Sequence, residues 1–423
     1  MSTTLYPFPP RQPAGLAPIG SAFSVTLGKM LDAGRAVDDL HTTLPYVRAA
    51  NIQDEGLRLT DVNEMPFSAA EARRLDLRKG DLLVVEGGAV GTCVVLDHDM
   101  PGWSFQKTVN RLRPTNDWST RYLAYVLRSY RDAGIIDLVC NGSTIPHLTA
   151  EKLRALRVPA VPPETQRTIA DFLDRETAQI DALVSKQEEF IEFLRERRRA
   201  AIEVAVSEVL ASGPRLKHII RSVRQGWSPQ CYSWPADGIN SWAVLKAGAA
   251  NGGVFRPMEN KELPSEETPR PEVVVQRGDL IVSRANTRDL VGSAAVVEGD
   301  FPRLMLSDKL YAFTLNEDQA LPQFVAAVLG SRRWRDLVQM QATGASSSML
   351  NISQSDIVNL PMTLPPVDEQ RRILTHLDEQ TAQIDALITK AQEHIGFAKE
   401  RRAALITAAV TGQLEVCTAW KAG

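Results

Sequence analysis

The chain carries the same helical sequence twice, and this repeat constrains its fold more than any other feature. The segment from Gln166 to Lys186 returns 204 residues later as Gln370 to Lys390, with thirteen of 21 positions identical. Shared helical composition alone would not produce such identity, so we interpret the chain as a tandem duplication. Each copy follows a proline pair and runs into a basic cluster; these are Pro162-Pro163 with 195–199, and Pro365-Pro366 with 399–402.

The duplication extends weakly into the segments that precede each helix. Residues 79–84, Lys-Gly-Asp-Leu-Leu-Val, resemble 277–282, Arg-Gly-Asp-Leu-Ile-Val. The stretch 142–148 resembles 344–350 in its small and hydroxyl-bearing residues. The helical parts therefore stayed similar while the rest of the two halves diverged.

The repeated segments predict two long helices that pair with each other. No proline or glycine interrupts residues 166–209, and a proline pair is tolerated in a first helical turn but not inside a helix. Apolar residues recur at seven-residue steps, with polar interruptions, as in a coiled coil. We predict a pseudo-twofold helix pair packed through Ile169, Leu173, Ile180, Leu183, Leu194, Ile373, Leu377, Ile384, Leu387 and Leu405.

The remaining sequence predicts an α+β fold with two globular halves. Short β-branched runs separated by Gly and Pro predict strands at 81–85, 92–96, 273–275 and 280–283, and residues 120–132 and 321–341 predict helices. Each half has about 150 residues, enough for its own core. The predicted order is a mixed α/β domain at 1–161, a spacer helix at 162–211, a second domain at 212–364, a second spacer helix at 365–415, and a tail at 416–423.

Composition excludes several classes of protein. The net charge of −3 and pI near 6.1 exclude a uniformly basic DNA coat. Four scattered cysteines without C-x-x-C spacing fit neither a disulfide framework nor a cysteine zinc site. Because no apolar run reaches the roughly 18 residues that span a bilayer, we expect a cytoplasmic protein with no membrane partner.

Motifs for catalysis are absent from the sequence. There is no G-x-x-x-x-G-K-[ST] loop, and residues 86–91, Glu-Gly-Gly-Ala-Val-Gly, lack the G-x-G-x-x-G frame of a dinucleotide site. No proline pair lies in the Asn/Asp-Pro-Pro-Tyr/Phe motif of adenine methyltransferases, and the six histidines have no metal-ligand spacing. We therefore expect no catalytic, cofactor-binding or metal-binding residue in this chain.

The first half contains a basic segment that favours contact with phosphate. Residues 106–131 hold six basic residues against one acid, with aromatic residues between them. The small hydroxyl residues near 142 could present donors to phosphate oxygens. An amphipathic helix with ordinary arginines on its wet side, and a plain turn, explain the same patterns. The candidate residues are Lys107, Arg111, Arg113, Arg121, Ser143 and Thr144.

The second half offers a comparable but less concentrated set in loop-like sequence. Basic and amide side chains surround residues 284–288, and a run of serines follows Gly344. Such side chains form hydrogen bonds with base edges as well as with phosphates. The candidates are Lys246, Arg284, Asn286, Arg288, Lys309, Ser346 and Ser347.

The whole pattern resembles the specificity subunits of type I restriction-modification systems. Each diverged half ends in Pro-Pro-x(2–3)-Gln-Arg-x-Ile, and the helix continues through Thr-Ala-Gln-Ile-Asp-Ala-Leu to Glu-Arg-Arg. The resemblance covers essentially the whole chain. The Gly-Asp-Leu runs at 80–82 and 278–280 also look like parts of that family's target-recognition domains.

The resemblance implies a non-catalytic subunit that reads double-stranded DNA. In this family each target-recognition domain reads one half of a bipartite, asymmetric site, and the antiparallel helix pair, a coiled-coil spacer, sets the gap between the halves. Two modification subunits, which bind S-adenosylmethionine and methylate adenine, dock on this scaffold, and ATP- and Mg-dependent restriction subunits join them. This chain itself would bind no cofactor.

Two other classes of function remain open from the sequence. A coiled-coil scaffold that does not contact DNA is consistent with the helices alone, although the basic segment and the divergence of the halves speak against it. An enzyme with a site between the halves is disfavoured by the missing motifs.

Overall fold

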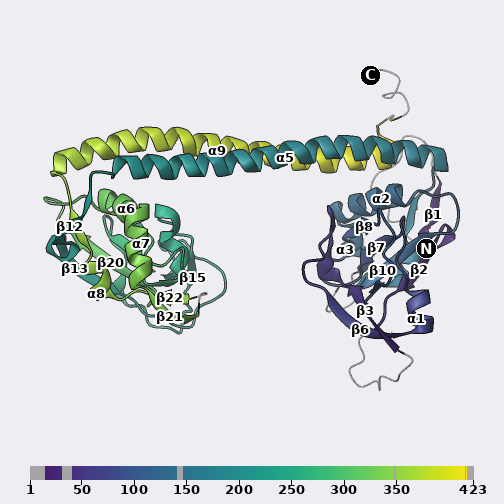
Figure 1. Ribbon diagram of the computed structural model, residues 1–423, viewed down its shortest axis with the longest axis horizontal. Helices are drawn as coiled ribbons and strands as arrows, with labels where there is room; N and C mark the ends of the chain where they lie inside the picture. Colours follow the sequence, from purple (N-terminus) through teal and green to yellow (C-terminus); the bar gives the residue numbers. More distant parts are fainter. Residues whose placement is uncertain (1–14, 31–40, 141–145, 347–348, 415, 417–423) are drawn as a thin grey trace. The chain divides into compact units, whose positions relative to one another are not determined.

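The computed structural model describes residues 15–30, 41–140, 146–346, 349–414 and 416, and these form two compact units (Figure 1). Unit 1 comprises residues 1–187 and 393–423, and unit 2 comprises residues 188–392. Each unit therefore combines one α+β domain with one end of both long helices, α5 (Pro163–Ala205) and α9 (Val367–Val410). No helix in the described part of the chain is long and apolar enough to span a membrane.

The domain of unit 1 is built on an antiparallel sheet with strand order β2-β10-β7-β8. The strands are β2 (Phe23–Leu27), β10 (Val109–Pro114), β7 (Leu82–Val85) and β8 (Cys93–Val95). A second sheet has the order β6-β3-β9, from β6 (Asn63–Ser68), β3 (His41–Val47) and β9 (Ser104–Phe105). Short pairs join β1 (Leu16–Pro18) to β11 (Arg157–Pro159) and β4 (Ile52–Gln53) to β5 (Gly56–Leu57).

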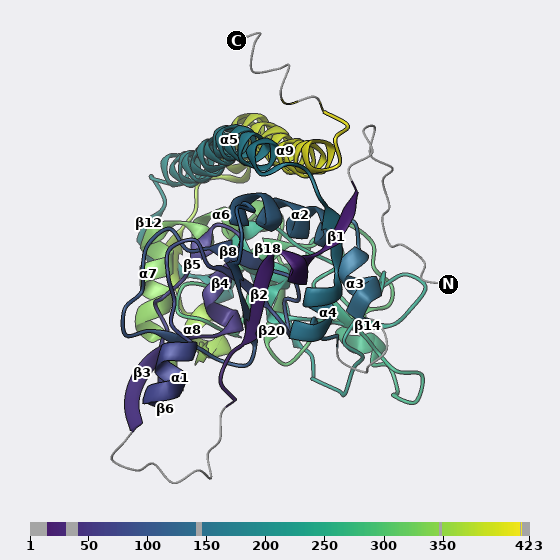
Figure 2. The same ribbon diagram turned by 90° about the vertical axis from the view of Figure 1, so that its right-hand side faces the viewer.

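Helices cover this sheet and connect it to the long helices. The predicted helix at 120–132 is confirmed as α2 (Thr120–Asp132), which lies between the sheet and α5 (Figure 1). Its buried face packs with Leu173 of α5 and Ile406 of α9 in one apolar core, so the domain and its segments of the long helices share a hydrophobic core. The other helices are α1 (Ala69–Arg74), beside β6 in Figure 2, α3 (Ile135–Cys140) and α4 (Ala150–Ala155).

The domain of unit 2 has the corresponding sheets in the same order. Its main sheet is β13-β20-β16-β18, with β13 (Ile220–Gln225), β20 (Leu310–Leu315), β16 (Leu280–Ser283) and β18 (Ala294–Val296). The second sheet is β15-β14-β19, from β15 (Asn260–Glu262), β14 (Ala243–Leu245) and β19 (Leu304–Met305). Further strands are β12 (Leu210–Arg215) with β23 (Pro361–Thr363), and β17 (Ala285–Asn286) with β22 (Met349–Asn351) and β21 (Thr343–Ser346).

Two of the predicted elements in this half differ from the structure. The predicted helix at 321–341 is divided into two helices, α6 (Pro322–Gly330) and α7 (Arg332–Gln341), because the chain is extended at Ser331, the residue before α7. The predicted strand at 273–275 includes the end of a 3₁₀ turn, Pro271–Val273, because a proline opens the segment and favours a turn. A last short helix is α8 (Gln354–Val358).

The long helices lie side by side within each unit, and ion pairs link them. In unit 1 Arg402 of α9 pairs with Asp181 of α5, at 2.9 Å from Nε to Oδ1. In unit 2 Arg198 of α5 pairs with Asp385 of α9 at 3.2 Å. Arg402 lies 204 positions after Arg198, and Asp385 lies 204 positions after Asp181. The same ion pair therefore forms in both units, with the arginine on α9 in unit 1 and on α5 in unit 2.

Most of the predicted packing residues are buried along these helices. Ile169, Leu173, Ile180, Leu194, Leu377 and Ile384 are buried, and Ile373 and Leu405 are partly buried. The prediction was wrong for Leu183 and Leu387, which occupy the same position in the two copies and are 50% and 43% exposed. The seven-residue series drifts about 20° per heptad around a straight helix, which carries these two leucines away from the contact.

An ion pair at the start of α1 gives a prediction about acid stability. Glu71 accepts from the Ser68 backbone N–H at 2.9 Å and from Lys29 Nζ at 2.6 Å. Burial alone would raise the pKa of Glu71, but the Lys29 and Ser68 hydrogen bonds lower it from 4.5 to about 2. The ionised carboxylate therefore stabilises the fold fully above pH 4.5, and this contribution is lost as the pH falls through about 2.

We expect Glu71→Gln to be less stable than the unsubstituted protein above pH 5, and the difference to shrink steadily toward pH 2. Unfolding midpoints of both proteins across this range measure it. Glu64→Gln, at an exposed carboxylate on the neighbouring strand, is the matched control and should leave the pH dependence unchanged. A constant gap between Glu71→Gln and the unsubstituted protein at every pH would contradict the proposed ionic contribution.

Candidate functional site

The two Gly-Asp-Leu runs form the same buried turn in the two domains. Gly80 and Gly278 have φ of +85° and +87°, a conformation that favours glycine. The aspartate that follows is 1% exposed in both cases. Asp81 accepts from the Arg78 backbone N–H at 2.8 Å, and Asp279 accepts from that of Gln276 at 2.6 Å. The motif is therefore a structural turn.

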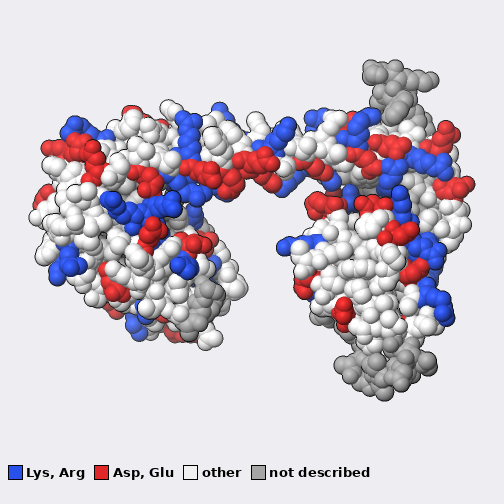
Figure 3. Space-filling model, viewed as in Figure 1, with Lys and Arg blue, Asp and Glu red and all other residues white. Residues whose placement is uncertain are grey.

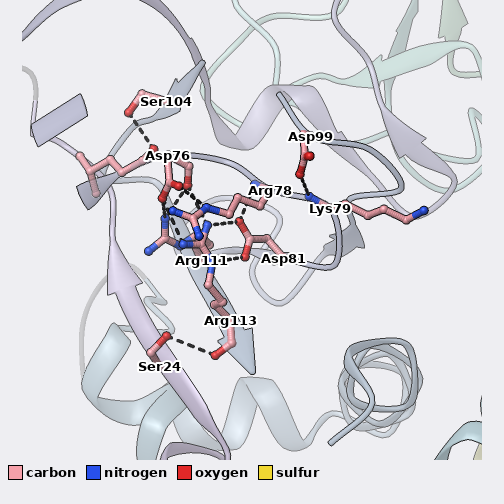
Figure 4. A network of polar contacts seen from close by, with 10 residues as sticks. Ser24, Asp76, Arg78, Lys79, Asp81, Asp99, Ser104, Arg111 and Arg113 are labelled. Atoms are coloured by element: carbon pink, nitrogen blue, oxygen red, sulfur yellow. Dashed lines mark hydrogen bonds and ion pairs between the residues drawn. The ribbon is translucent and has the colours of Figure 1, made fainter. Parts of the chain in front are cut away.

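Each buried aspartate is neutralised by an arginine, but from different strands. In unit 1 Arg113 of β10 donates to both carboxylate oxygens of Asp81 at 2.7 Å (Figure 4). In unit 2 Arg224 of β13 donates to both oxygens of Asp279, and Thr314 of β20 adds a bond at 3.2 Å. The charge pair is thus retained while its cation has moved between adjacent strands.

Two of the candidate phosphate contacts, Arg111 and Arg113, take part in ion pairs at this turn. The Arg111 side chain is 6% exposed and lies 3.0 Å from Asp76, to which Arg113 is also joined (Figure 4). Burial lowers the pKa of Arg111, and the neighbouring Arg113 adds to the shift, while Asp76 and Asp81 oppose it. Both arginines are thus held by carboxylates of the domain, so their charges are already paired within it.

Three further arginines of the basic segment are also bound by groups from elsewhere in the chain. Arg121 pairs with Asp171 at 2.6 Å and with Asp174, both on α5. Arg131 pairs with Asp54 at 2.6 Å, and Arg128 donates to the carbonyl of that residue at 2.5 Å. Most of the positive charge counted along this segment is therefore paired within the fold. Of the predicted cations of this segment, Lys107 and Arg121 are exposed, and Arg121 is paired with α5.

The candidates of unit 2 lie around β17 and its neighbours. Asn286 ends β17, and its Nδ2 donates to Asn251 at 3.2 Å, while Arg284 donates to the carbonyl of Asp308 at 3.0 Å. Arg288 is exposed, and Lys309 and Lys246 are partly exposed. Arg284, Asn286 and Lys309 are thus brought close together by the sheet edge. Ser346 ends β21, and Ser143, Thr144 and Ser347 lie outside the described residues.

A corresponding edge in unit 1 carries different chemistry. The Leu148 N–H donates to the Glu86 carbonyl at 2.9 Å, as the Ile352 N–H donates to that of Arg284 at 3.0 Å. Glu86 and Arg284 therefore hold the same place in the two domains. Burial raises the pKa of Glu86, although the hydrogen bond from Asn110 opposes the shift. A carboxylate on one edge and a guanidinium on the other give the domains different donors and acceptors.

Two buried glutamines attach the domains to the helices, and sequence reasoning missed their role. Gln166 and Gln370 are fully buried. Gln166 accepts from the N–H of Ser119, just before α2, and Gln370 accepts from that of Leu321, just before α6, both at 2.9 Å. These glutamines stand in the repeated Pro-Pro-x(2–3)-Gln motif, so the repeat itself carried the signal.

The described residues give no sign of a metal centre or a uniform charged face. Within these residues, no group of three or more His, Cys, Asp or Glu is placed to hold a metal ion. Acidic and basic side chains lie next to each other along the long helices on the face seen in Figure 3. Such a mixed surface fits contact with proteins better than contact with a polyanion.

Comparisons with known proteins agree with this architecture. Residues 28–192 match the family model of the type I restriction modification DNA specificity domain. The EcoEI specificity subunit of Escherichia coli is 32% identical over 178 residues, which are 42% of this chain and 30% of that protein. The EcoKI specificity subunit of E. coli K12 is 22% identical over 417 residues, covering 94% of this chain and 89% of that protein.

A solved structure supports the fold over nearly the full length. A chain from a structure described as showing complex assembly and conformational transition of the type I R-M system covers 96% of this chain and 100% of its own, with a TM-score of 0.63 and 19% identity. The matching domain, the full-length relatives and the shared fold lead to one conclusion. This chain is similar to the specificity subunits of type I restriction-modification systems over nearly its full length, and its residues 28–192 match the DNA specificity domain of that family.

Proposed function

We propose that each domain reads one half of a bipartite, asymmetric DNA site, and that the chain performs no catalysis itself. The observation that carries this proposal is the pair of corresponding sheet edges at Glu86 and Arg284. A carboxylate accepts hydrogen bonds from the amino group of cytosine, whereas arginine donates to guanine and asparagine pairs with adenine. Edges of the same geometry but different chemistry would recognise different base pairs.

The edge in unit 2 carries more side chains that can form hydrogen bonds with DNA than the edge in unit 1. Arg284 links β16 to β17, Asn286 ends β17, and Lys309 precedes β20, the strand that pairs with β16. Guanidinium, amide and ammonium groups from one edge provide donors to bases and phosphates together. In unit 1 Thr108 holds the position of Lys309, since its carbonyl accepts from the Glu86 N–H at 2.8 Å as that of Lys309 accepts from the Arg284 N–H, and the exposed Lys107 precedes it. We assign base contact to these edges, and we assign Arg111 and Arg113 a structural role in their ion pairs with Asp76 and Asp81.

The long helices would act as a coiled-coil spacer that fixes the gap between half-sites. A tandem duplication supports this role, because the ion pairs and the buried glutamines recur at a spacing of 204 residues. The separation and rotation of reading heads set half-site spacing on DNA. Helices joined to the core of each domain supply a stiff connection.

The partners proposed for this chain are the other subunits of such a system. Two modification subunits would dock on the helices and carry the S-adenosylmethionine chemistry, and restriction subunits would carry the ATP- and Mg-dependent steps. The mixed charges along the helices support docking of proteins there. Adenine would be flipped out of the duplex into the pocket of a modification subunit.

Methylation mapping tests this function directly. Cells that express the chain with its modification subunit should acquire a new methylated motif with two different short halves around a fixed gap. Long-read sequencing of their DNA, compared with cells that lack the chain, measures it. Assembly of the complex without any new methylated motif would contradict DNA reading and favour a scaffold without a DNA role.

A further inference from the structure

Unit 2 contains a cavity of about 560 Å³ between its domain and its helix segments. Its walls come from α6, from the neighbouring loops, and from both long helices. This volume falls within the roughly 300–1,000 Å³ typical of small-molecule sites. The residues that matter for its chemistry are Ala327, Gly330, Asp378, Thr381, Arg198 and Arg199.

Unit 1 fills the corresponding space with its own side chains. The contacts of the buried glutamines place Ser119 and Leu321 at the same point, so Tyr125 corresponds to Ala327, six residues later. The Tyr125 hydroxyl donates to Asp174 of α5 at 2.7 Å and lies 3.3 Å from the Thr177 hydroxyl. A phenol ring therefore occupies the gap between domain and helix in unit 1.

The residues that hold this phenol in unit 1 have counterparts that line the cavity in unit 2. Asp174 and Thr177 correspond to Asp378 and Thr381 in the repeated helix sequence. Thr381 donates to the Leu377 carbonyl at 2.9 Å, as Thr177 donates to that of Leu173 at 2.7 Å. Unit 2 thus retains the two residues that bind the phenol hydroxyl in unit 1, as Asp378 and Thr381, while alanine stands in place of the tyrosine.

A second replacement enlarges the vacant space. Arg128 lies over the ring of Tyr125 in unit 1, with its guanidinium carbon 5.6 Å from the ring centre. The counterpart of Arg128 is Gly330, where an added Cβ would meet nothing within 4 Å. Loss of both side chains accounts for a cavity larger than one ring.

We propose that this cavity is a binding site for a small molecule that carries a phenol ring. The hydroxyl donates to Asp378 at the place where Tyr125 donates to Asp174, and the ring packs over Ala327. The apolar wall at Val254 and Phe255 suits the ring, and Arg198 and Arg199 line the same cavity. The site is separate from the sheet edges assigned to DNA.

Titration of the full-length chain with p-cresol tests the proposal. We expect one saturable site with a Kd of about 0.1–1 mM, since small ligands gain at most roughly 1.5 kcal/mol per non-hydrogen atom and usually less. Saturation-transfer NMR and calorimetry measure binding and stoichiometry. Absence of saturable binding at 10-fold above this range, about 10 mM, would overturn the proposal.

Substitutions on the two sides of the cavity locate the site. Ala327→Tyr should fill the cavity from within and weaken p-cresol binding at least about 10-fold. Asp378→Ala, at an exposed helix position that is safe for folding, should weaken binding by a similar factor through loss of one hydrogen bond to a charged group. Unchanged affinity in both variants would place p-cresol elsewhere and overturn the assignment.

A matched change in unit 1 provides the positive control. Tyr125→Ala opens the corresponding space there, so the p-cresol stoichiometry should rise from one site to two. Binding should also persist when the chain is assembled with its modification subunits. Loss of binding on assembly would mean that a partner side chain fills the cavity, and the proposal of a small-molecule site would be wrong.

Discussion

Replacing Asp279 by alanine should destabilise unit 2 by about 3–5 kcal/mol, the usual cost of removing one partner from a buried ion pair. Asp279 is 1% exposed, and the Arg224 side chain that faces it is 17% exposed. Without the carboxylate, the guanidinium is left in a poorly hydrated place with one remaining acceptor, the carbonyl of Val274. The turn also loses the bond from the Gln276 N–H.

Hydrogen exchange measured peptide by peptide shows where the loss occurs. Peptides from β16 and β20 should exchange faster in Asp279→Ala, because these strands flank the turn. Peptides from β7 and β10 in unit 1 serve as an internal reference and should keep their rates. Asp81→Ala should instead speed exchange in β7 and β10 and leave β16 and β20 unchanged, since the Asp81 carboxylate binds Arg113 in unit 1.

Two further variants separate charge from shape at this turn. Asp279→Asn keeps an acceptor for the Gln276 N–H and should cost less than alanine. The double change Arg224→Met with Asp279→Leu removes both charges and should recover part of the loss. If Asp279→Ala altered exchange in neither unit, the buried pair would have no role in stability.

The long helices were predictable because their constraints are local. Exclusion of proline and glycine, and apolar residues spaced at seven, depend on neighbours within a few turns. The proline pair at 162–163 also predicted where α5 starts, at Pro163. Exposure of Leu183 and Leu387 was not predictable from the heptad pattern, because it depends on how straight the helices are.

The basic segment shows why charge counted along a chain misleads. Its arginines are neutralised by Asp54, Asp76 and Asp81, and by acids of α5. These acids lie at least 32 residues away in sequence from the arginine that each one binds. Only the fold brings them together, so a local count overstated the positive face. The candidates near Arg284 lie in loop-like sequence, and the fold brings Arg284, Asn286 and Lys309 close together; that they read DNA stays a prediction.

Replacing Arg284 by alanine should change one half of the methylated motif and leave the other half unaltered. Arg284 lies on the edge of unit 2, whereas the corresponding place in unit 1 is held by Glu86. A lost bidentate contact to a base reduces discrimination by about 1–3 kcal/mol, or roughly 5- to 150-fold. One position of one half-site should therefore become degenerate in long-read methylation maps.

Glu86→Gln is the reciprocal variant, and it should relax a position in the opposite half-site. Lys107→Ala is a control for phosphate contact at the same edge, since it should lower methylation across all sites without relaxing any position. The gap between the half-sites should stay fixed in all three variants, because none of them touches α5 or α9. Relaxation of both halves by Arg284→Ala would show that the two edges do not read separate half-sites, since a domain confined to one half-site can alter only that half.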